Sequence, residues 1–210
     1  MVDWTTVSSL VTGGGTLVLA VATFAAVRSA NRAARVAEQA LLIGVRPLLV
    51  PSRLDDVQQK VFYGDGKFER IEGGRGAAEV DAGNVYLAIS LRNAGRGIGV
   101  LHGWRFRSGR QPQDGHPPLD DFRAQQRDIF IAPGDIGFWQ AALRDESDPQ
   151  YAEAIAGVRS LEMLTIDILY GDHEGGQRAI SRFTLQPRGD DPVWLASVVR
   201  HWNIDRPDPR

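Results

Sequence analysis

Residues 4–27 read WTTVSSLVTGGGTLVLAVATFAAV, and they decide the architecture of this chain because none of them is charged. The stretch lies between Asp3 and Arg28 and is longer than the roughly 20 residues that a helix needs to cross a bilayer. Trp4 stands at one end, where an indole ring favours the headgroup region. We therefore predict that residues 1–27 form a short N-terminal tail and a transmembrane helix.

A cleaved signal peptide is the main alternative, because Ala20, Val21 and Ala22 have the small-x-small form of a cleavage site. No basic residue precedes the apolar run, however, and the run is longer than the apolar region of a typical signal peptide. A buried core helix is disfavoured by the same length and by the basic residues that follow. The sequence therefore favours a retained anchor.

The flanking charges predict an orientation. The side before the apolar run has only Asp3 and the amino terminus, whereas the other side has five arginines against Glu38. By the positive-inside rule, the N-terminus lies outside and the C-terminal domain lies in the cytoplasm of a single-pass inner-membrane protein. The first three arginines are also expected to contact anionic lipid headgroups, unless they only solvate a helix. The five arginines are Arg28, Arg32, Arg35, Arg46 and Arg53.

The helix should continue past the membrane as a juxtamembrane helix over residues 28–46, since no helix breaker occurs before Pro47. Small residues recur along it at alternating steps of three and four, which allows two helices to approach closely. This seam predicts contact with a second copy or with another membrane protein subunit; the alternative is that an alanine-rich chain produces such a stripe by chance. The seam contains Ser9, Thr12, Thr16, Leu19, Thr23, Ala26, Ala30, Ala33, Ala37, Ala40 and Gly44.

Composition excludes several functions. The sequence has 24 basic and 26 acidic residues, a net charge of -2, and so lacks the basic field that nucleic-acid binding usually requires. It has no cysteine, which rules out disulfides, thiolate metal sites and thiol nucleophiles.

Residues 47–210 are predicted to be a mainly β domain. Residues 85–91 alternate between apolar and other side chains, which predicts a half-buried strand, and Gly64-Asp65-Gly66 predicts a hairpin turn. Asp148 and Pro149 are typical of a helix start, which predicts one short helix ending near Gly157. Eight or nine short strands with one helix favour an immunoglobulin-like β-sandwich.

Two further segments of this domain also show alternation. Ile98, Val100, His102, Trp104 and Phe106 alternate with other residues and are predicted to share one face of a strand. Residues 193–202 alternate as well but follow aspartates and a proline, so helix and strand both stay open.

One short motif has a counterpart elsewhere. The strand and turn Leu91-Arg92-Asn93-Ala94-Gly95-Arg96-Gly97 contain an Asn-x-Gly-x-Gly pattern. It resembles the turn of uncharacterised bacterial single-pass membrane proteins in which an N-terminal membrane helix carries a cytoplasmic β-sandwich. The resemblance implies that anchor and that fold, but it implies no activity.

No motif predicts a catalytic or cofactor site. Gly95-Arg96-Gly97-Ile98-Gly99 follows a strand but leads into another strand, unlike a dinucleotide loop, and serine-hydrolase, P-loop and zinc-protease motifs are missing. Asp167, Asp172 and His173 offer metal-ligating atoms but match no calcium-loop spacing, so no metal site is predicted.

These observations predict a non-enzymatic, membrane-anchored interaction or scaffolding module that self-associates or joins a larger membrane complex. A cytoplasmic ligand-binding or sensory domain is the first alternative. An anchored hydrolase or metal-dependent enzyme that uses Asp167, Asp172 and His173 is the second.

Overall fold

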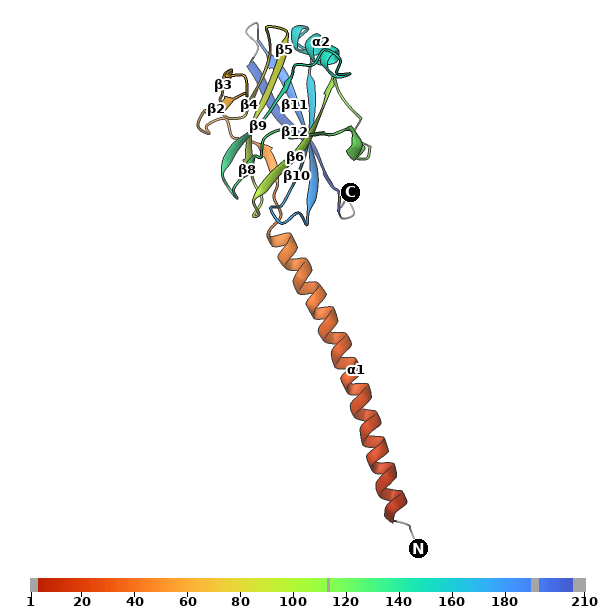
Figure 1. Ribbon diagram of the computed structural model, residues 1–210. Coiled ribbons are helices and arrows are strands. Elements are labelled where there is room, and N and C mark those ends of the chain that lie inside the picture. The colour runs from red at the N-terminus through yellow and green to blue at the C-terminus, as the bar shows by residue number, and fades with distance from the viewer. Residues whose placement is uncertain (1–3, 113, 190–192, 206–210) are drawn as a thin grey trace. The chain divides into compact units, whose positions relative to one another are not determined.

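The computed structural model describes residues 4–112, 114–189 and 193–205 and divides into two units, Met1–Gly44 and Val45–Arg210. The first unit is one helix, α1 (Trp4–Gly44), of 41 residues (Figure 1). It ends three residues before Pro47, as expected from the missing N–H of proline and its effect on the residue before it. The predicted long N-terminal helix is confirmed, whereas its division at residue 27 stays a prediction because that boundary depends on the bilayer.

Length and composition qualify Gly13–Glu38 of α1, 26 residues, to cross a membrane, although a signal sequence meets the same test. None of the side chains in this stretch is buried by the rest of the chain. In water, the apolar side chains of this helix would be exposed to solvent, which is unfavourable.

The second unit contains a ten-stranded antiparallel sheet and a separate two-stranded sheet within the described residues. One α-helix, α2 (Tyr151–Arg159), and a short 3-10 helix (Leu119–Asp121) lie between strands. The strands are β1 (Leu49–Pro51), β2 (Gln59–Phe62), β3 (Phe68–Ile71), β4 (Arg75–Asp81), β5 (Asn84–Asn93), β6 (Gly99–Ser108), β7 (Arg123–Ala124), β8 (Phe130–Ile131), β9 (Ile136–Leu143), β10 (Leu164–Gly171), β11 (Arg178–Arg188) and β12 (Val193–Asn203).

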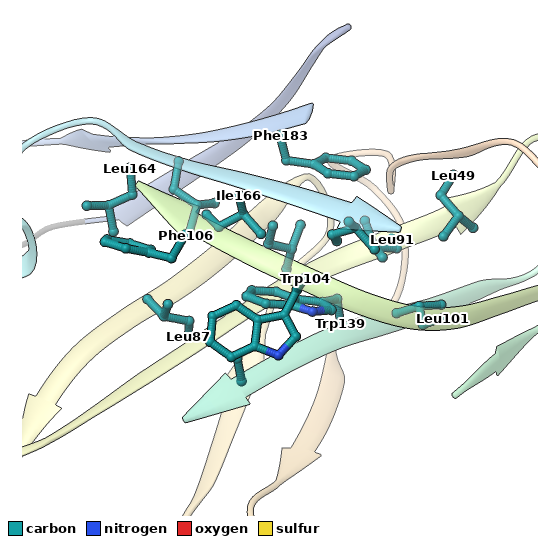
Figure 2. Close-up of a cluster of buried hydrophobic side chains, with 14 of the residues drawn as sticks. Leu49, Leu87, Leu91, Leu101, Trp104, Phe106, Trp139, Leu164, Ile166 and Phe183 are labelled. Atoms are coloured by element: carbon teal, nitrogen blue, oxygen red, sulfur yellow. The ribbon is translucent and has the colours of Figure 1, made fainter. Parts of the chain in front are cut away.

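The large sheet has the order β1-β5-β4-β12-β11-β10-β6-β7, with β9 on β5 and β8 on β6. Its narrowest connection is β4 to β12, which pair through only Gly76 with Trp194 and Arg75 with Leu195. On either side of this connection the sheet turns toward itself: Trp104 of β6 and Trp139 of β9 are edge-to-face at 5.6 Å, although their strands are not paired. Figure 2 shows both indoles within the hydrophobic core, between β6 and β9.

This arrangement confirms the mainly β class, and the immunoglobulin-like subtype stays a prediction. Residues 193–203 form a strand that pairs with β11 along its whole length, which resolves the open choice between helix and strand. Helix α2 begins at Tyr151, two residues later than predicted. The Asp148 side chain accepts the N–H of Gln150 at 2.8 Å, so it caps a turn that precedes the helix.

The prediction that residues 85–91 form a half-buried strand was wrong, because both faces of β5 are covered. Leu87 and Ile89 pack in the main core, whereas Tyr86 and Ala88 of the opposite face pack in a second cluster beneath the β2–β3 hairpin. Alternation in sequence shows that the two faces differ, but it does not show whether a hairpin from elsewhere in the chain covers the second one.

The predicted face of β6 was wrong at its first half. Trp104 and Phe106 are buried as expected, but His102 is exposed and Leu101 is buried instead. The register between β6 and β10 shifts at Leu169 and Tyr170, which leaves His102 without a partner opposite. A β-bulge of this kind adds one residue to one strand and therefore reverses the alternation beyond it.

The Asn-x-Gly-x-Gly turn fastens the first residues of the domain. The buried Asn93 amide oxygen accepts the N–H groups of Leu48 (3.1 Å) and Gly95 (2.9 Å), and its Nδ2 donates to the carbonyls of Gly97 (2.7 Å) and Ile131 (2.9 Å). A Cβ at Gly97 would lie 1.6 Å from the Val45 carbonyl oxygen. The motif therefore has a structural role in which the side chain of Asn93 uses all four of its hydrogen-bonding positions.

Candidate functional site

The β2–β3 hairpin is the part of the domain that exposes an unusual combination of side chains. Gln59 pairs with Ile71 and Phe62 with Phe68, so alternate residues point to opposite sides. The inner side chains Val61, Tyr63 and Ile71 are buried against β5. The Tyr63 hydroxyl donates to the Leu87 carbonyl at 3.2 Å, which holds the hairpin on the sheet.

The outer side of the hairpin is aromatic. Phe62 and Phe68 are 47% and 48% exposed, and their ring centroids are 5.9 Å apart. The Lys60 ammonium lies 4.7 Å from one ring centroid and 4.6 Å from the other. We call these three residues the aromatic hairpin face; it combines apolar contact area with a cation held by the rings.

Charged groups at the hairpin turn hold it in place. Asp65 accepts hydrogen bonds from the Tyr86 hydroxyl and from Nη2 of Arg144, the latter at 2.9 Å. The bond from Tyr86 and then the Arg144 guanidinium lower the pKa of Asp65 to about 2. This carboxylate stays ionised over the physiological range and keeps the turn attached to β5 and to the end of β9.

A second charged cluster lies along the hairpin and β4. The Lys67 ammonium lies 2.9 Å from Glu79 and 2.8 Å from Asp81. Burial, together with a hydrogen bond to Glu79, raises the pKa of Glu69 to about 7, while that same bond and the Lys67 ammonium lower the pKa of Glu79. The hairpin therefore contains a carboxyl group that titrates near neutral pH.

The predicted seam and lipid-contacting residues all lie on α1. From Thr16 to Ala40 their side chains are exposed, as are those of Arg28, Arg32 and Arg35. Ser9 and Thr12 lie in the helix, but their side chains are outside the described part. Exposure is what a helix-contacting or lipid-contacting surface requires in a single copy, so both assignments stay predictions.

The structure does not bring the metal candidates together. Asp167 accepts two hydrogen bonds from the buried Arg182, at 2.6 and 2.9 Å, and Asp172 binds the N–H of Gly176 at 2.8 Å within its own turn. His173 is largely exposed. Among residues 4–112, 114–189 and 193–205, no three potential metal ligands form a group.

One pair has the geometry of a nucleophile and a base: Ser181 Oγ lies 2.6 Å from His201 Nδ1. The Ser181 side chain is fully buried, however, and its hydroxyl also donates to the Tyr170 hydroxyl at 2.9 Å. A substrate could not reach this oxygen without opening the sheet. We therefore interpret the pair as part of the polar interior between β10, β11 and β12.

The sequence reasoning located the hairpin but missed its outer face. The run Val61-Phe62-Tyr63 before the turn contains the information, because alternation along a strand turns the middle of three consecutive apolar residues to the side opposite the other two.

Comparison with known protein families, with curated proteins and with solved structures finds no match for this chain.

Proposed function

We propose that this protein is a non-enzymatic, membrane-anchored interaction module. In this proposal α1 crosses the inner membrane with its N-terminus outside, and the β domain, with an immunoglobulin-like arrangement of strands, contacts a partner in the cytoplasm. The partner is a second copy or another subunit of a membrane complex. The aromatic hairpin face carries the proposal, because aromatic residues such as the exposed Phe62 and Phe68 are enriched in protein interfaces.

Rigidity supports a binding role for this face. The hairpin is attached by the buried side chains of Val61 and Ile71, by the Tyr63 hydroxyl and by the Asp65–Arg144 ion pair. A partner would therefore meet a preformed surface and would not have to order a loop, which lowers the entropic cost of binding.

The test of this face compares three variants of the full chain in mild detergent. Phe62→Ser and Phe68→Ser should each abolish the co-purification of a partner, whereas Phe130→Ser should leave it intact. Phe130 is a suitable control because it is also exposed and apolar but lies on β8. Equal effects of all three changes, or none, would refute a role for the hairpin.

The seam on α1 is tested by cross-linking in membranes, since the chain has no cysteine of its own. Single cysteines at Ala30, Ala33, Ala37 and Ala40 should give dimers if the partner is a second copy. Cysteines at Arg35 and Glu38, on other faces, should give few. A flat profile would show that the alanine stripe reflects composition only.

The proposed orientation is tested by reporter fusions at the C-terminus. A reporter that works only in the cytoplasm should be active, and a periplasm-dependent reporter should be silent. The opposite pattern would place the β domain outside.

A further inference from the structure

The loop before β2 exposes apolar side chains beside aspartates. Leu54 is 75% exposed and Val57 is 69% exposed, the highest values among the large apolar side chains that the structure describes in the β domain. Asp55, which lies between them in the sequence, is exposed as well. We call Leu54, Asp55, Asp56 and Val57 the acidic loop; its two aspartates outnumber the adjacent basic residue, Arg53. This loop therefore combines apolar contact area with negative charge.

The acidic loop is anchored to the rest of the domain. The Arg53 N–H donates to the Asp56 carboxylate at 2.7 Å, and the Asp56 N–H donates to the Arg53 carbonyl at 3.1 Å. Just before this turn, the Ser52 hydroxyl oxygen accepts the N–H of Gly74 at 2.9 Å and lies 2.6 Å from the Ser90 hydroxyl oxygen. A partner would therefore meet a preformed turn and would not have to order it.

The outer side of the hairpin has the opposite charge. Arg70 lies directly opposite Lys60 in the register of β2 and β3, and both side chains are exposed beside Phe62 and Phe68. Neither cation forms an ion pair with an acidic side chain in the part of the chain that the structure describes. Like charges placed opposite each other destabilise a pair of strands. Carboxylates of a partner would relieve this repulsion.

We infer that the aromatic hairpin face, together with Arg70, binds the acidic loop of a second copy of this chain. In this arrangement the aspartates of one copy lie against Lys60 and Arg70 of the other, and Leu54 and Val57 cover its two phenyl rings. Each copy has both surfaces, so a two-fold axis forms the same contact twice, as in the commonest homodimers. The inference rests on the proposed function, because it names the partner of the same face.

The charges favour a second copy over an anionic membrane surface as the partner. Such a surface would attract Lys60 and Arg70 but would repel Asp55 and Asp56, which precede β2 by only a few residues. A second copy provides an opposite charge for each of these groups.

The contact is expected to be weak by itself, because so few residues bury less area than a stable interface. Two copies anchored by α1 in one membrane would meet at a higher effective concentration than free domains, which favours a weak contact. The test therefore uses the full chain in membranes.

Cross-linking between two differently tagged copies tests the contact within the β domain. One copy has a cysteine in place of Gln58, next to the acidic loop, and the other has one in place of Gly64, in the hairpin turn. Both positions are exposed, and a Cβ at Gly64 would have no other atom within 4 Å. A short thiol-reactive reagent should join these two copies, because the chain has no other cysteine.

An exchange of charges makes the test specific. Copies with Lys60→Glu and Arg70→Glu should cross-link to one another at least about fivefold less, because attraction becomes repulsion. Copies with Asp55→Lys should show the same loss. A mixture of the two variants should recover the yield, since both contacts of the mixed dimer then join opposite charges. Recovery would also show that both variants are folded.

Two controls locate the effect. The double variant Arg96→Glu with Arg127→Glu makes the same charge change at exposed arginines outside the hairpin and should leave the yield unchanged. A cysteine in place of the exposed Ala152 on α2, used instead of the one at Gly64, should cross-link poorly whatever the charges of the hairpin.

Unchanged yields in both charge variants, or no recovery in their mixture, would overturn the second copy as the partner. If Phe62→Ser still removes a different co-purifying protein in that case, the proposed function stands and only this inference fails. If Phe62→Ser and Phe68→Ser leave every association intact, both fail.

Discussion

Two apolar segments of this protein, α1 and β5, place similar side chains in opposite surroundings. Leu19 of α1 is 68% exposed, whereas Leu87 and Ile89 of β5 are fully buried. A helix satisfies its backbone hydrogen bonds within itself, so α1 can exist in lipid without any neighbour. A strand cannot, and β5 forms its ladder hydrogen bonds with β1, β4 and β9, while the β2–β3 hairpin covers one of its faces. The comparison predicts that changes in α1 affect membrane association, whereas changes in β5 affect the stability of the domain.

Deletion of residues 1–44 should have the largest effect on localisation and the smallest on folding. Membrane association should be lost completely, because the apolar helix is the predicted anchor. The remaining domain should stay soluble and unfold cooperatively, because none of its core residues in the described part of the chain lies on α1. Fractionation and thermal denaturation measure the two outcomes. Aggregation without a cooperative transition would mean that α1 belongs to the domain.

A buried charge in the sheet is tolerated only because it has partners of opposite charge. Residues 4–27 of α1, by contrast, contain no charged residue. Asp167 is 1% exposed and is held by Arg182, with Arg105 at 3.6 Å. Asp167→Asn should destabilise the domain by about 3–5 kcal/mol, because it leaves the buried Arg182 without its anion. Denaturant titration measures the change.

The matched control for that prediction is Asp205→Asn. Asp205 pairs with Arg178 at 2.8 Å but keeps 31% of its side chain exposed. Its loss should cost no more than about 1 kcal/mol, as for other exposed ion pairs. Equal losses at the two sites would show that burial does not decide the strength of these pairs.

Truncation of one apolar side chain in each segment tests the comparison itself. Ile89→Ala should lower the free energy of unfolding of the β domain by about 2–5 kcal/mol, through lost burial and the cavity left behind. Leu19→Ala removes a comparable side chain from α1 and should leave the unfolding of the domain unchanged. A similar drop in both variants would mean that α1 packs on the domain.

The smallest expected effect is a pH dependence from Glu69, whose pKa is raised to about 7. The folded state holds this proton more tightly than the unfolded chain, where the pKa is near 4.5. The stabilisation is therefore complete below that value and is lost as the pH rises toward 7. Glu69→Gln should flatten the melting temperature over this interval. Glu72→Gln, an exposed acid near the end of β3, should not.

The sequence predicted much of the fold because the features involved are local. The uncharged run of residues 4–27, the absence of a helix breaker before Pro47 and the turn at Gly64-Asp65-Gly66 each act over a few residues. The bulge at His102 and the second covered face of β5 could not be predicted in this way. Both depend on which strand or hairpin lies opposite, and that partner is far away in the sequence.

The outer face of the hairpin and the surroundings of Gln125 differ in the same respect. The outward aromatic residues of the hairpin follow from the alternation around a turn that the sequence reveals. The hydrogen bond from Gln125 to the Gln140 carbonyl does not, because these residues become neighbours only when the residues after β7 cross from β6 to β9.

The sequence by itself therefore determined the long apolar helix, the mainly β class and the hairpin, since hydrophobic periodicity and backbone preferences act within a segment. Only the tertiary structure decided that residues 193–203 form a strand, that Asn93 fastens the start of the domain and that Asp167 is neutralised by Arg182. Each of these depends on contacts between residues that are distant in the sequence, and local sequence preferences do not determine such contacts.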